Sequence, residues 1–426
     1  MTEISRRELL VGAPLLPVAL AQPQPNWAIE AALLTDRVQT LFWDPRSAMY
    51  RAPVHGPETV PSGPAHDRGY VLWPSIEMFH ALVEAELCRP GRWRDQIAAV
   101  YDGLEKYRHP PAHAYNAWLD FPGNVDRYYD DNAILVRLLV KATRATGDPR
   151  YRARARDVLE NFVRRGWDPS GEPGGMLWGV DPSRQGTSDR VACSTSMTAL
   201  AALELAGAGV DVARNVEWAE ALMDWLVKRL LDTDGLVMDG LVPPDYSVRR
   251  VKWTYNTGLA IQAHVLLWRR TRRRERLELA RTMGEAAIRR TGSLYDGLVR
   301  DPERNFWWDS SFFTAYLADG LTELWRVTRD ARLRAETLRN AAFAYQYVRD
   351  PSDNLYFRNW RLWRIDRPRW ELWRRRTGID HPLEPDEDER GRSPDNMRRP
   401  VGERPVVKSL LSNAGATRLL WIVSRL

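Results

Sequence analysis

Amphipathic helices of two kinds alternate along most of this chain, and the alternation limits the folds available to it. From Trp27 onward, apolar residues recur at positions i, i+3, i+4 and i+7, as in a helix with one buried face, and alternating strand patterns are almost absent. Helices with many charges are expected at 27–43, 92–106, 150–165, 214–230, 274–290 and 330–348, and more apolar helices at 74–87, 132–146, 196–206, 257–270, 311–327 and 411–424.

The starts of the apolar helices are regularly spaced, and five of the six carry polar side chains. Marker residues at equivalent positions are 58, 63, 62 and 54 residues apart, and these are Trp73, Asp131, Ser194, Asn256 and Ser310. Repeats of this length indicate helical hairpins. We expect an all-α (α/α)6 barrel in which six outer helices shield six inner ones. An open solenoid is the alternative, but it gives no reason for polar residues to recur at the same end of every inner helix.

Two segments stand outside the repeat. Residues 1–25 contain Arg6 and Arg7, a short apolar stretch and a small-residue cleavage site, which is typical of a twin-arginine signal and predicts export to the periplasm or beyond. Residues 26–426 are expected to form a single barrel domain with an irregular Trp-rich insert at 350–406. Such an insert either closes over a cleft or is held to the barrel by its tryptophans.

Composition narrows the possible partners. The formal charge is +6, but the basic residues are spread among acids on many helix faces, so no nucleic acid is expected. No later segment has eighteen uninterrupted apolar residues, so no membrane span is expected. The 19 Trp, 15 Tyr and 9 Phe residues include flat rings that suit sugar faces. We expect an oligo- or polysaccharide substrate, a monomer and no cofactor.

Few residues suggest a metal or a disulfide. Glu77 and His80 lie one turn apart, but no second pair of this kind appears, so a polar core contact is expected and no metal site. Cys88 and Cys193 fall in or next to apolar helical runs, which indicates buried thiols, and whether they pair stays open.

The segment Tyr128-Tyr129-Asp130-Asp131-Asn132 carries the strongest chemical signal, because it places two carboxylates at the start of an apolar helix. The partial positive charge of a helix N-terminus favours carboxylates, so one aspartate could simply be the N-cap. Two carboxylates are also the minimal equipment for cleaving a glycosidic bond. Their closeness favours the retaining arrangement and unequal pKa values.

The motifs around these aspartates resemble those of glycoside hydrolase family 76, the endo-α-1,6-mannanase-like proteins. The resemblance covers about 110–270 and rests on the segments Tyr129-Asp130-Asp131-Asn132-Ala133, Gly174-Gly175-Met176-Leu177-Trp178, Asp234–Gly240 and Trp253-Thr254-Tyr255-Asn256-Thr257-Gly258. It implies an (α/α)6 barrel and retaining hydrolysis or transfer at α-mannosidic linkages, with α-1,6-mannan-type glycans as the expected substrate. It also implies that Asp130 is the nucleophile and Asp131 the general acid/base, with Tyr255 and Asn256 at the cleft.

Aromatic and polar residues near the inner helix starts are expected to bind the substrate, and these are Trp73, Tyr128, Tyr129, Asn132, Trp178, Tyr255, Asn256, Trp308 and Asp309. For Asp309 a helix cap is the alternative role. The chain departs from the family at the third inner start, which has Cys193-Ser194-Thr195-Ser196 in place of asparagines, and at the fifth, which lacks a lysine-glycine signature. These differences alter cleft groups and leave the acid pair intact.

Two other functions stay open. The barrel is shared with sugar epimerases and unsaturated-uronide hydrolases. An epimerase would need catalytic histidines at the cleft, and the seven histidines show no paired placement at inner helix starts. A catalytically inactive carbohydrate-binding barrel is the other alternative, and it predicts sugar binding without turnover.

Overall fold

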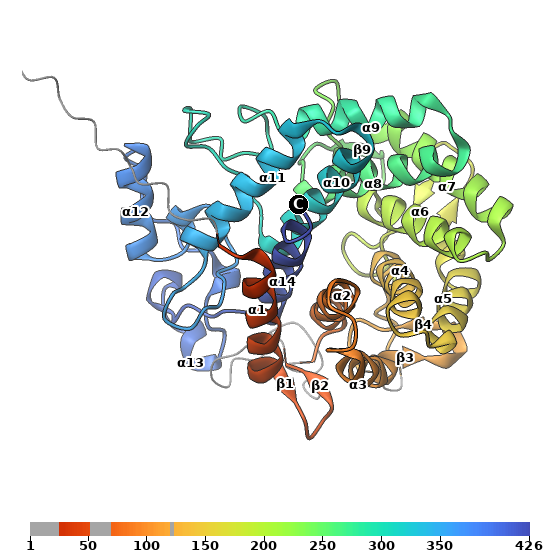
Figure 1. The fold of residues 1–426 in the computed structure, drawn as a ribbon, viewed down its shortest axis with the longest axis horizontal. Coiled ribbons are helices and arrows are strands. Elements are labelled where there is room, and N and C mark those ends of the chain that lie inside the picture. Colours follow the sequence, from red (N-terminus) through yellow and green to blue (C-terminus); the bar gives the residue numbers. More distant parts are fainter. Residues whose placement is uncertain (1–24, 52–69, 120–122) are drawn as a thin grey trace, which may run out of the picture.

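The protein forms a ring of helices inside a second ring of helices (Figure 1). The structure is a computed structural model and describes residues 25–51, 70–119 and 123–426. The inner helices are α2 (Leu72–Cys88), α4 (Tyr129–Thr146), α6 (Ala192–Gly207), α8 (Thr254–Thr271), α10 (Ser311–Thr328) and α14 (Leu410–Val423). The outer helices are α1 (Trp27–Phe42), α3 (Arg94–Leu104), α5 (Pro149–Asn161), α7 (Val212–Leu230), α9 (Arg274–Ala287) and α11 (Ala331–Phe343).

The inner ring is closed. Each inner helix packs against the next in the order α2, α4, α6, α8, α10 and α14, and α14 packs back against α2. Outer helix α1 lies beside α14, so the first and last helices of the barrel are neighbours (Figure 1). This closure confirms the predicted (α/α)6 barrel and excludes the open solenoid.

The two rings bury different amounts of each helix, as their sequences predicted. On α6 every residue from Ala192 to Ala206 is buried, because α4, α7 and α8 surround it. On α7 the buried side chains form one face that includes Trp218, Leu222 and Leu226. An inner helix therefore tolerates apolar residues all round, whereas an outer helix needs a charged face.

Glycine allows two inner helices to touch backbone to backbone. A Cβ at Gly258 on α8 would lie 2.5 Å from the Cα of Leu317 on α10, and a Cβ at Gly320 would lie 2.4 Å from the carbonyl oxygen of Gly258. No larger residue fits at either position without separating these helices.

A buried ion pair joins the last inner helix to the first. Arg418 on α14 donates to the Glu77 carboxylate at 2.7 Å, and the Tyr316 hydroxyl on α10 donates to the other Glu77 oxygen at 2.5 Å. Glu77 is fully buried and Arg418 almost fully. His80, one turn from Glu77, lies in the core 3.6 Å from Glu84. These residues make polar core contacts, as predicted.

Short strands and turns connect the helices. The antiparallel pairs are β1 (Trp43–Asp44) with β2 (Met49–Tyr50), β3 (Arg108–His109) with β4 (Ala114–Tyr115), β5 (Trp167–Asp168) with β6 (Gly175–Met176), and β7 (Arg190–Val191) with β8 (Gly240–Val242), which also pairs with β9 (Ser247–Arg249). Short 3-10 helices span Glu105–Tyr107, Pro110–Ala112, Val163–Gly166, Leu362–Arg364, Glu387–Glu389 and Val401–Glu403, and a π-helical turn spans Ala344–Val348. Strands of two or three residues are too short to leave an alternating pattern in the sequence.

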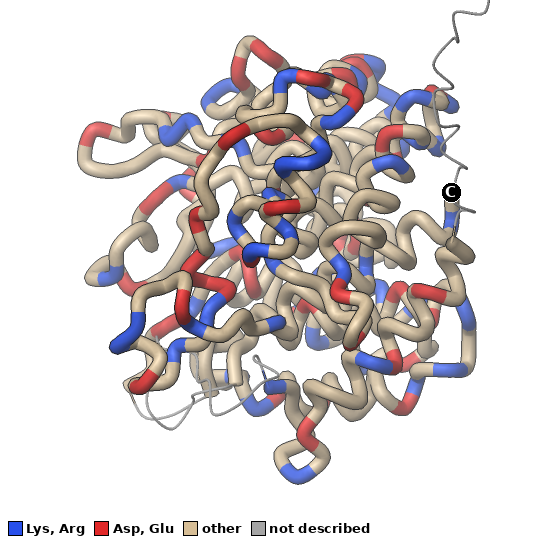
Figure 2. The backbone as a smooth tube through the Cα atoms, turned by 90° about the vertical axis from the view of Figure 1, so that its left-hand side faces the viewer, with Lys and Arg blue, Asp and Glu red and all other residues tan. Residues whose placement is uncertain are grey.

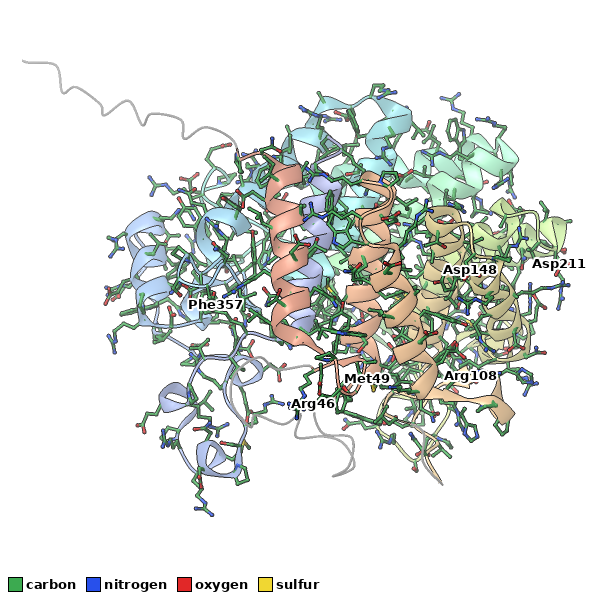
Figure 3. The ribbon with its side chains drawn as sticks, turned by 60° about the horizontal axis from the view of Figure 1, so that its bottom comes forward. Arg46, Met49, Arg108, Asp148, Asp211 and Phe357 are labelled. Atoms are coloured by element: carbon green, nitrogen blue, oxygen red, sulfur yellow. The ribbon has the colours of Figure 1, made fainter. Side chains whose placement is uncertain are left out.

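The Trp-rich insert packs against the side of the barrel next to α11 and contains helices α12 (Arg367–Thr377) and α13 (Pro394–Met397) (Figure 1). The Trp360 indole donates to the Ser311 hydroxyl at 3.0 Å, and the Trp363 indole donates to the Asp296 carboxylate at 3.1 Å. Phe357, labelled in Figure 3, is buried with the Arg369 guanidinium 4.4 Å from its ring centre. Of the two predicted alternatives, these contacts match tryptophans that hold the insert to the barrel.

Charges of both signs are interspersed along the backbone on the side shown in Figure 2, and basic residues do not form one stripe there. Within the described ranges, no helix combines the length and the apolar character that crossing a membrane requires. The predicted export signal falls almost entirely outside the described residues. Cys88 and Cys193 are both free thiols.

Removing the closing ion pair should destabilise the barrel. We expect Glu77→Gln to lower the free energy of unfolding by about 3–5 kcal/mol, because it leaves the Arg418 charge buried without its counter-ion. Urea denaturation measures this change. The double variant Glu77→Gln/Arg418→Met should lose less stability than Glu77→Gln alone, and Glu172→Gln, at an exposed ion pair with Arg229, should change little. A Glu77→Gln protein as stable as the parent would contradict this role.

Candidate active site

A cavity of about 470 Å³ opens where the N-terminal ends of the inner helices meet. Helices α2, α4, α6, α8 and α10 each contribute side chains to its wall, together with the loops before them. Its lining is mainly aromatic and apolar with a few charged groups, and consists of Val71, Trp73, Ala117, Trp118, Tyr128, Asp130, Asp131, Ile134, Trp178, Val191, Cys193, Met197, Asp239, Arg249, Trp253, Tyr255, Phe313 and Tyr316. Large aromatic walls with few polar groups are typical of a small-molecule or glycan site.

The start of α4 is fixed by residues on either side of the aspartate pair. The Tyr129 ring stacks on Phe162 with the ring centres 4.8 Å apart, and it fills the space where Gly166 has no side chain. The buried Asn132 amide accepts from the Tyr115 N–H at 2.8 Å and donates to the Tyr115 carbonyl at 3.0 Å. With these neighbours anchored in the core, both aspartates are presented to the cavity.

Neither aspartate is the N-cap of α4. Tyr128 occupies that position with an extended backbone and no capping hydrogen bond from its side chain, and both aspartates lie in the first helical turn. The interpretation of this pair as a simple helix cap is therefore wrong. Helix α4 begins three residues earlier than the sequence pattern indicated, because the polar first turn carries no apolar signal.

Asp130 is held by three donors from three parts of the chain. Its Oδ1 accepts from the Asp131 N–H at 2.9 Å, and its Oδ2 accepts from the Trp178 indole at 3.0 Å. The Cys193 thiol lies 3.5 Å from the same Oδ2. Burial raises the pKa of Asp130 to about 6, while these hydrogen bonds act in the opposite direction by stabilising the ionised form.

Asp131 has a contrasting environment on the same helical turn. Among the described residues, none donates a hydrogen bond to its carboxyl group. Burial raises its pKa well above the usual value, and the nearby negative charges of Asp130, Asp126 and Glu77 add to this effect. Asp131 therefore holds its proton more tightly than Asp130 does. The two adjacent carboxyls thus differ in how readily they ionise, because their surroundings differ.

Trp178 reaches Asp130 because its own backbone pairs with the start of α4. The Tyr129 N–H donates to the Trp178 carbonyl at 2.9 Å, and Tyr128 forms an isolated β-bridge with Gly179. The rings of Tyr128 and Trp178 then lie with centres 4.9 Å apart on one side of the cavity. This local pairing couples the position of the indole to that of the aspartate.

A second aromatic group comes from α8, α10 and α2. The Tyr255 ring stacks on Phe313 with centres 4.2 Å apart and planes 11° apart, and Trp73 stacks on the same phenylalanine at 5.9 Å. Trp253 joins this group at 5.7 Å from Phe313. The cavity wall thus contains a second aromatic group besides the Tyr128 and Trp178 rings.

A charged pair completes the lining. The Arg249 guanidinium lies 2.7 Å from the Asp239 carboxylate and also pairs with Asp189, while the Asn256 amide donates to Asp239 at 3.2 Å. The sheet of β7, β8 and β9 places this pair beside the start of α6. Burial raises the pKa of Asp239 although Arg249 opposes that shift.

The structure brings six of the predicted site residues together in the cavity wall: Trp73, Tyr128, Asp130, Asp131, Trp178 and Tyr255. Asn132 and Tyr129 instead anchor α4, and Asn256 supports Asp239. Asp309 is buried and accepts from the Thr254 N–H at 3.1 Å and the Ser310 N–H at 2.8 Å. Asp309 is therefore bonded to the backbone at the starts of α8 and α10, but Trp253 and Ser310 occupy the N-cap positions, so its predicted alternative as a helix cap is wrong.

Trp308 also lies outside the cavity wall. Its ring sits 5.1 Å from Trp253, its indole donates to the Ser293 carbonyl, and the Arg361 guanidinium of the insert lies 4.7 Å from the ring centre. Trp308 thus links the aromatic surface of the cavity to the insert.

Sequence reasoning missed several cavity residues as binding groups, including Trp118, Asp239, Arg249, Trp253 and Phe313. A signal existed for some of them. Asp239 is the last residue but one of the Asp234–Gly240 segment of the family resemblance, and Trp253 directly precedes α8. Across the described residues, no group of three or more His, Cys, Asp or Glu side chains is placed to hold a metal ion.

Comparison with known proteins identifies the family. The protein-family model described as Glycosyl hydrolase family 76 matches residues 30–363 of the chain. The chain belongs to this family. The Meiotically up-regulated gene 191 protein of Schizosaccharomyces pombe is 29% identical to it over 375 residues, which cover 83% of each chain.

Solved structures of glycosyl hydrolase family 76 share the fold of the chain. The GH76 alpha-mannanase of Bacteroides thetaiotaomicron superposes with a TM-score of 0.72 at 16% identity, covering 94% of this chain and 96% of its own. The GH76A alpha-1,6-mannanase of Salegentibacter sp. HEL1_6 gives 0.68 at 19% identity, covering 94% and 99%. An inactive variant of that enzyme, with two adjacent aspartates replaced by asparagine, has been solved in complex with alpha-1,6-mannotriose.

The raised pKa of Asp131 predicts an effect on stability. The folded protein keeps this proton at pH values where the unfolded chain releases it, so the free energy of unfolding falls as the pH rises above the ordinary aspartate value. Asp131→Asn removes the ionisation. We expect this variant to raise the Tm more at pH 8 than at pH 5, as measured by calorimetry.

Asp148→Asn provides the matched control, because Asp148 caps the outer helix α5 outside the cavity (Figure 3). Hydrogen bonds from Arg150 hold the pKa of Asp148 below its usual value. Its substitution should not raise the Tm at pH 8. An equal change in the Tm of Asp131→Asn at both pH values would contradict the assigned environment.

Proposed function

We propose that the protein is a retaining glycoside hydrolase that cleaves or transfers α-mannosidic linkages, with α-1,6-linked mannans as its substrate class. The observation that carries the proposal is the contrast between two adjacent carboxyls in one aromatic cavity: Asp130 accepts three hydrogen bonds and Asp131 accepts none from the described residues. Membership of glycosyl hydrolase family 76 supports the reaction class. The alpha-1,6-mannanase of shared fold, whose inactive variant lacks two adjacent aspartates, supports the linkage and the residues.

In the first step, the Asp130 carboxylate attacks the anomeric carbon while Asp131 gives its proton to the leaving glycosidic oxygen. The bond to the leaving sugar breaks and a glycosyl ester forms on Asp130. Asp131, now ionised, takes a proton from a water molecule or from an acceptor sugar hydroxyl. That oxygen attacks the anomeric carbon, releases Asp130 and restores both protonation states.

The walls of the cavity suit a sugar in this position. The rings of Tyr128 and Trp178, and those of Tyr255 and Phe313, present flat apolar faces for stacking in the cavity wall. Asp239 and Arg249 supply an acceptor and donors for sugar hydroxyls. These contacts would hold the anomeric carbon near Asp130, and placement of this kind is a large part of catalysis.

The alternative enzymes with this architecture, the sugar epimerases and unsaturated-uronide hydrolases, are less well supported by the site. An epimerase needs histidines at the cavity, but no described histidine belongs to the lining, and His80 and His264 are buried in inner helices. Export of the protein rests on the sequence of residues 1–25 and stays a prediction.

Loss of either carboxyl should strongly reduce turnover. We expect Asp131→Asn to reduce kcat/KM on α-1,6-manno-oligosaccharides by about 10²–10⁴-fold, the usual range for a lost general acid. Asp130→Asn should reduce it at least as much, because no covalent intermediate forms. Chromatography of released sugars measures this. Asp148→Asn should keep the parental rate, and a folded Asp130→Asn protein with parental activity would remove the assignment.

The stereochemistry of the product tests the retaining mechanism. Two successive displacements at the anomeric carbon restore its configuration, so the first sugar released from an α-mannoside should be the α-anomer. Proton NMR of the reaction mixture within the first minutes, before the anomers equilibrate, distinguishes the two products. A β-anomer as the initial product would show that a water attacks directly.

A further inference from the structure

A thiol and a tyrosine stand behind the proposed nucleophile. Cys193, in the first turn of α6, lies with its Sγ 3.5 Å from the Oδ2 of Asp130, and only 4% of the cysteine is exposed. Tyr255, in the first turn of α8, belongs to the same cavity wall, and its hydroxyl acts electrostatically on this sulfur. Three inner helices thus contribute one member each to a chain that runs from Tyr255 through Cys193 to Asp130.

The direction of the hydrogen bonds in this chain follows from the environment of each group. Burial raises the pKa of the Cys193 thiol well above its usual value, and the negative charges of Asp130 and Asp239 add to the shift, so the sulfur keeps its proton. Burial likewise raises the pKa of the Tyr255 hydroxyl well above the usual value. The thiol therefore donates to the carboxylate, and the protonated Tyr255 hydroxyl is available to donate to the sulfur.

We propose that Cys193 and Tyr255 are positioning residues that keep Asp130 ionised and oriented for attack, and thereby set the acid limb of the pH–activity profile. The proposal rests on the proposed function for its link to catalysis, but the contact itself stands on geometry. An ionised carboxylate accepts a hydrogen bond more strongly than a protonated carboxyl does, so the chain favours the attacking form over the protonated form.

The weak donor has a mechanistic advantage. The Trp178 indole already donates to Oδ2 at 3.0 Å, and a second strong donor on the same oxygen would hold its electron pair more tightly. A thiol is a weak donor, so it orients the carboxylate at little cost to nucleophilicity. The alternative is that Cys193 only fills space as a small apolar side chain. The two roles differ in what they predict for titration.

Other charges also act near Asp130, and the test must leave them unchanged. Asp131 shares its helical turn, and Asp126 and Glu77 act on Asp131. Asp239, which is paired with Arg249, acts on Cys193. Substitutions at Cys193 and Tyr255 alter none of these groups. A shift in the titration of Asp130 in such variants therefore reports the loss of the donor chain.

The test compares Cys193→Ala, which removes the donor, with Cys193→Ser, which restores a donor of similar size, and with Tyr255→Phe, which removes the supporting hydroxyl. Infrared difference spectroscopy follows the carboxylate band that is missing in Asp130→Asn, so it measures the titration of Asp130 without any turnover. The parental midpoint is expected near pH 6, since burial raises the pKa of Asp130 to about 6.

We expect Cys193→Ala to move the midpoint of Asp130 upward by about 0.5–1 pH unit, which corresponds to the loss of one modest hydrogen bond. Tyr255→Phe should move it in the same direction by less, and Cys193→Ser should leave it at or below the parental value. The acid limb of kcat/KM on α-1,6-mannotriose should shift with the spectroscopic midpoint.

Two results would overturn the positioning role. One is a midpoint in Cys193→Ala equal to that of the parent, and the other is an equal shift in Cys193→Ser and Cys193→Ala, which a space-filling role predicts. Failure of the proposed function can be told apart from failure of the positioning role. If the parent protein cleaves no mannoside, the infrared titration still measures whether Cys193→Ala shifts the midpoint of Asp130, because that measurement needs no turnover.

Discussion

The buried ion pair between Glu77 and Arg418 connects the closure of the barrel with the electrostatics of its cavity. The Glu77 carboxylate accepts from Arg418 on the last inner helix and from Tyr316 on the fifth, so it closes the ring at the point where the chain has no covalent continuity. Removing one partner of such a buried pair would leave the other charge without its counter-ion, which is costly in the core. The negative charge of Glu77 also adds to the raised pKa of Asp131, so the closure of the ring and the acidity of the site are linked.

The same fold gives two adjacent and chemically identical side chains different environments. Asp130 receives donors from its own helix, from the Trp178 loop and from α6, whereas Asp131 faces other carboxylates. Proteins commonly separate an acid from a base in this way, through surroundings and not through residue type. The closed ring is a precondition, because the donors and the negative charges come from segments far apart in the sequence.

Particular residues show how far the sequence could predict the site. Tyr128 and Tyr129 look equivalent in the sequence, yet Tyr128 lines the cavity while Tyr129 stacks in the core on Phe162. Asp309 and Asp239 both follow apolar segments, but Asp309 bonds to the backbone at the starts of α8 and α10, whereas Asp239 reaches the cavity. The irregular first turns and the short loop strands decide these orientations, and helical periodicity does not describe them. Cys193 stood out only as a departure from the family.

The sequence by itself determined the alternation of inner and outer helices, their number and the position of the aspartate pair at an inner helix start. The reason is that a helix buried on all sides and a helix buried on one side select different residues along their length. It also carried enough motif order to indicate the family. Only the tertiary structure decided which rings and charges face the cavity, which aspartate is held by donors, and how the insert is attached. Those features arise from contacts between segments tens to hundreds of residues apart, and such contacts leave no local pattern.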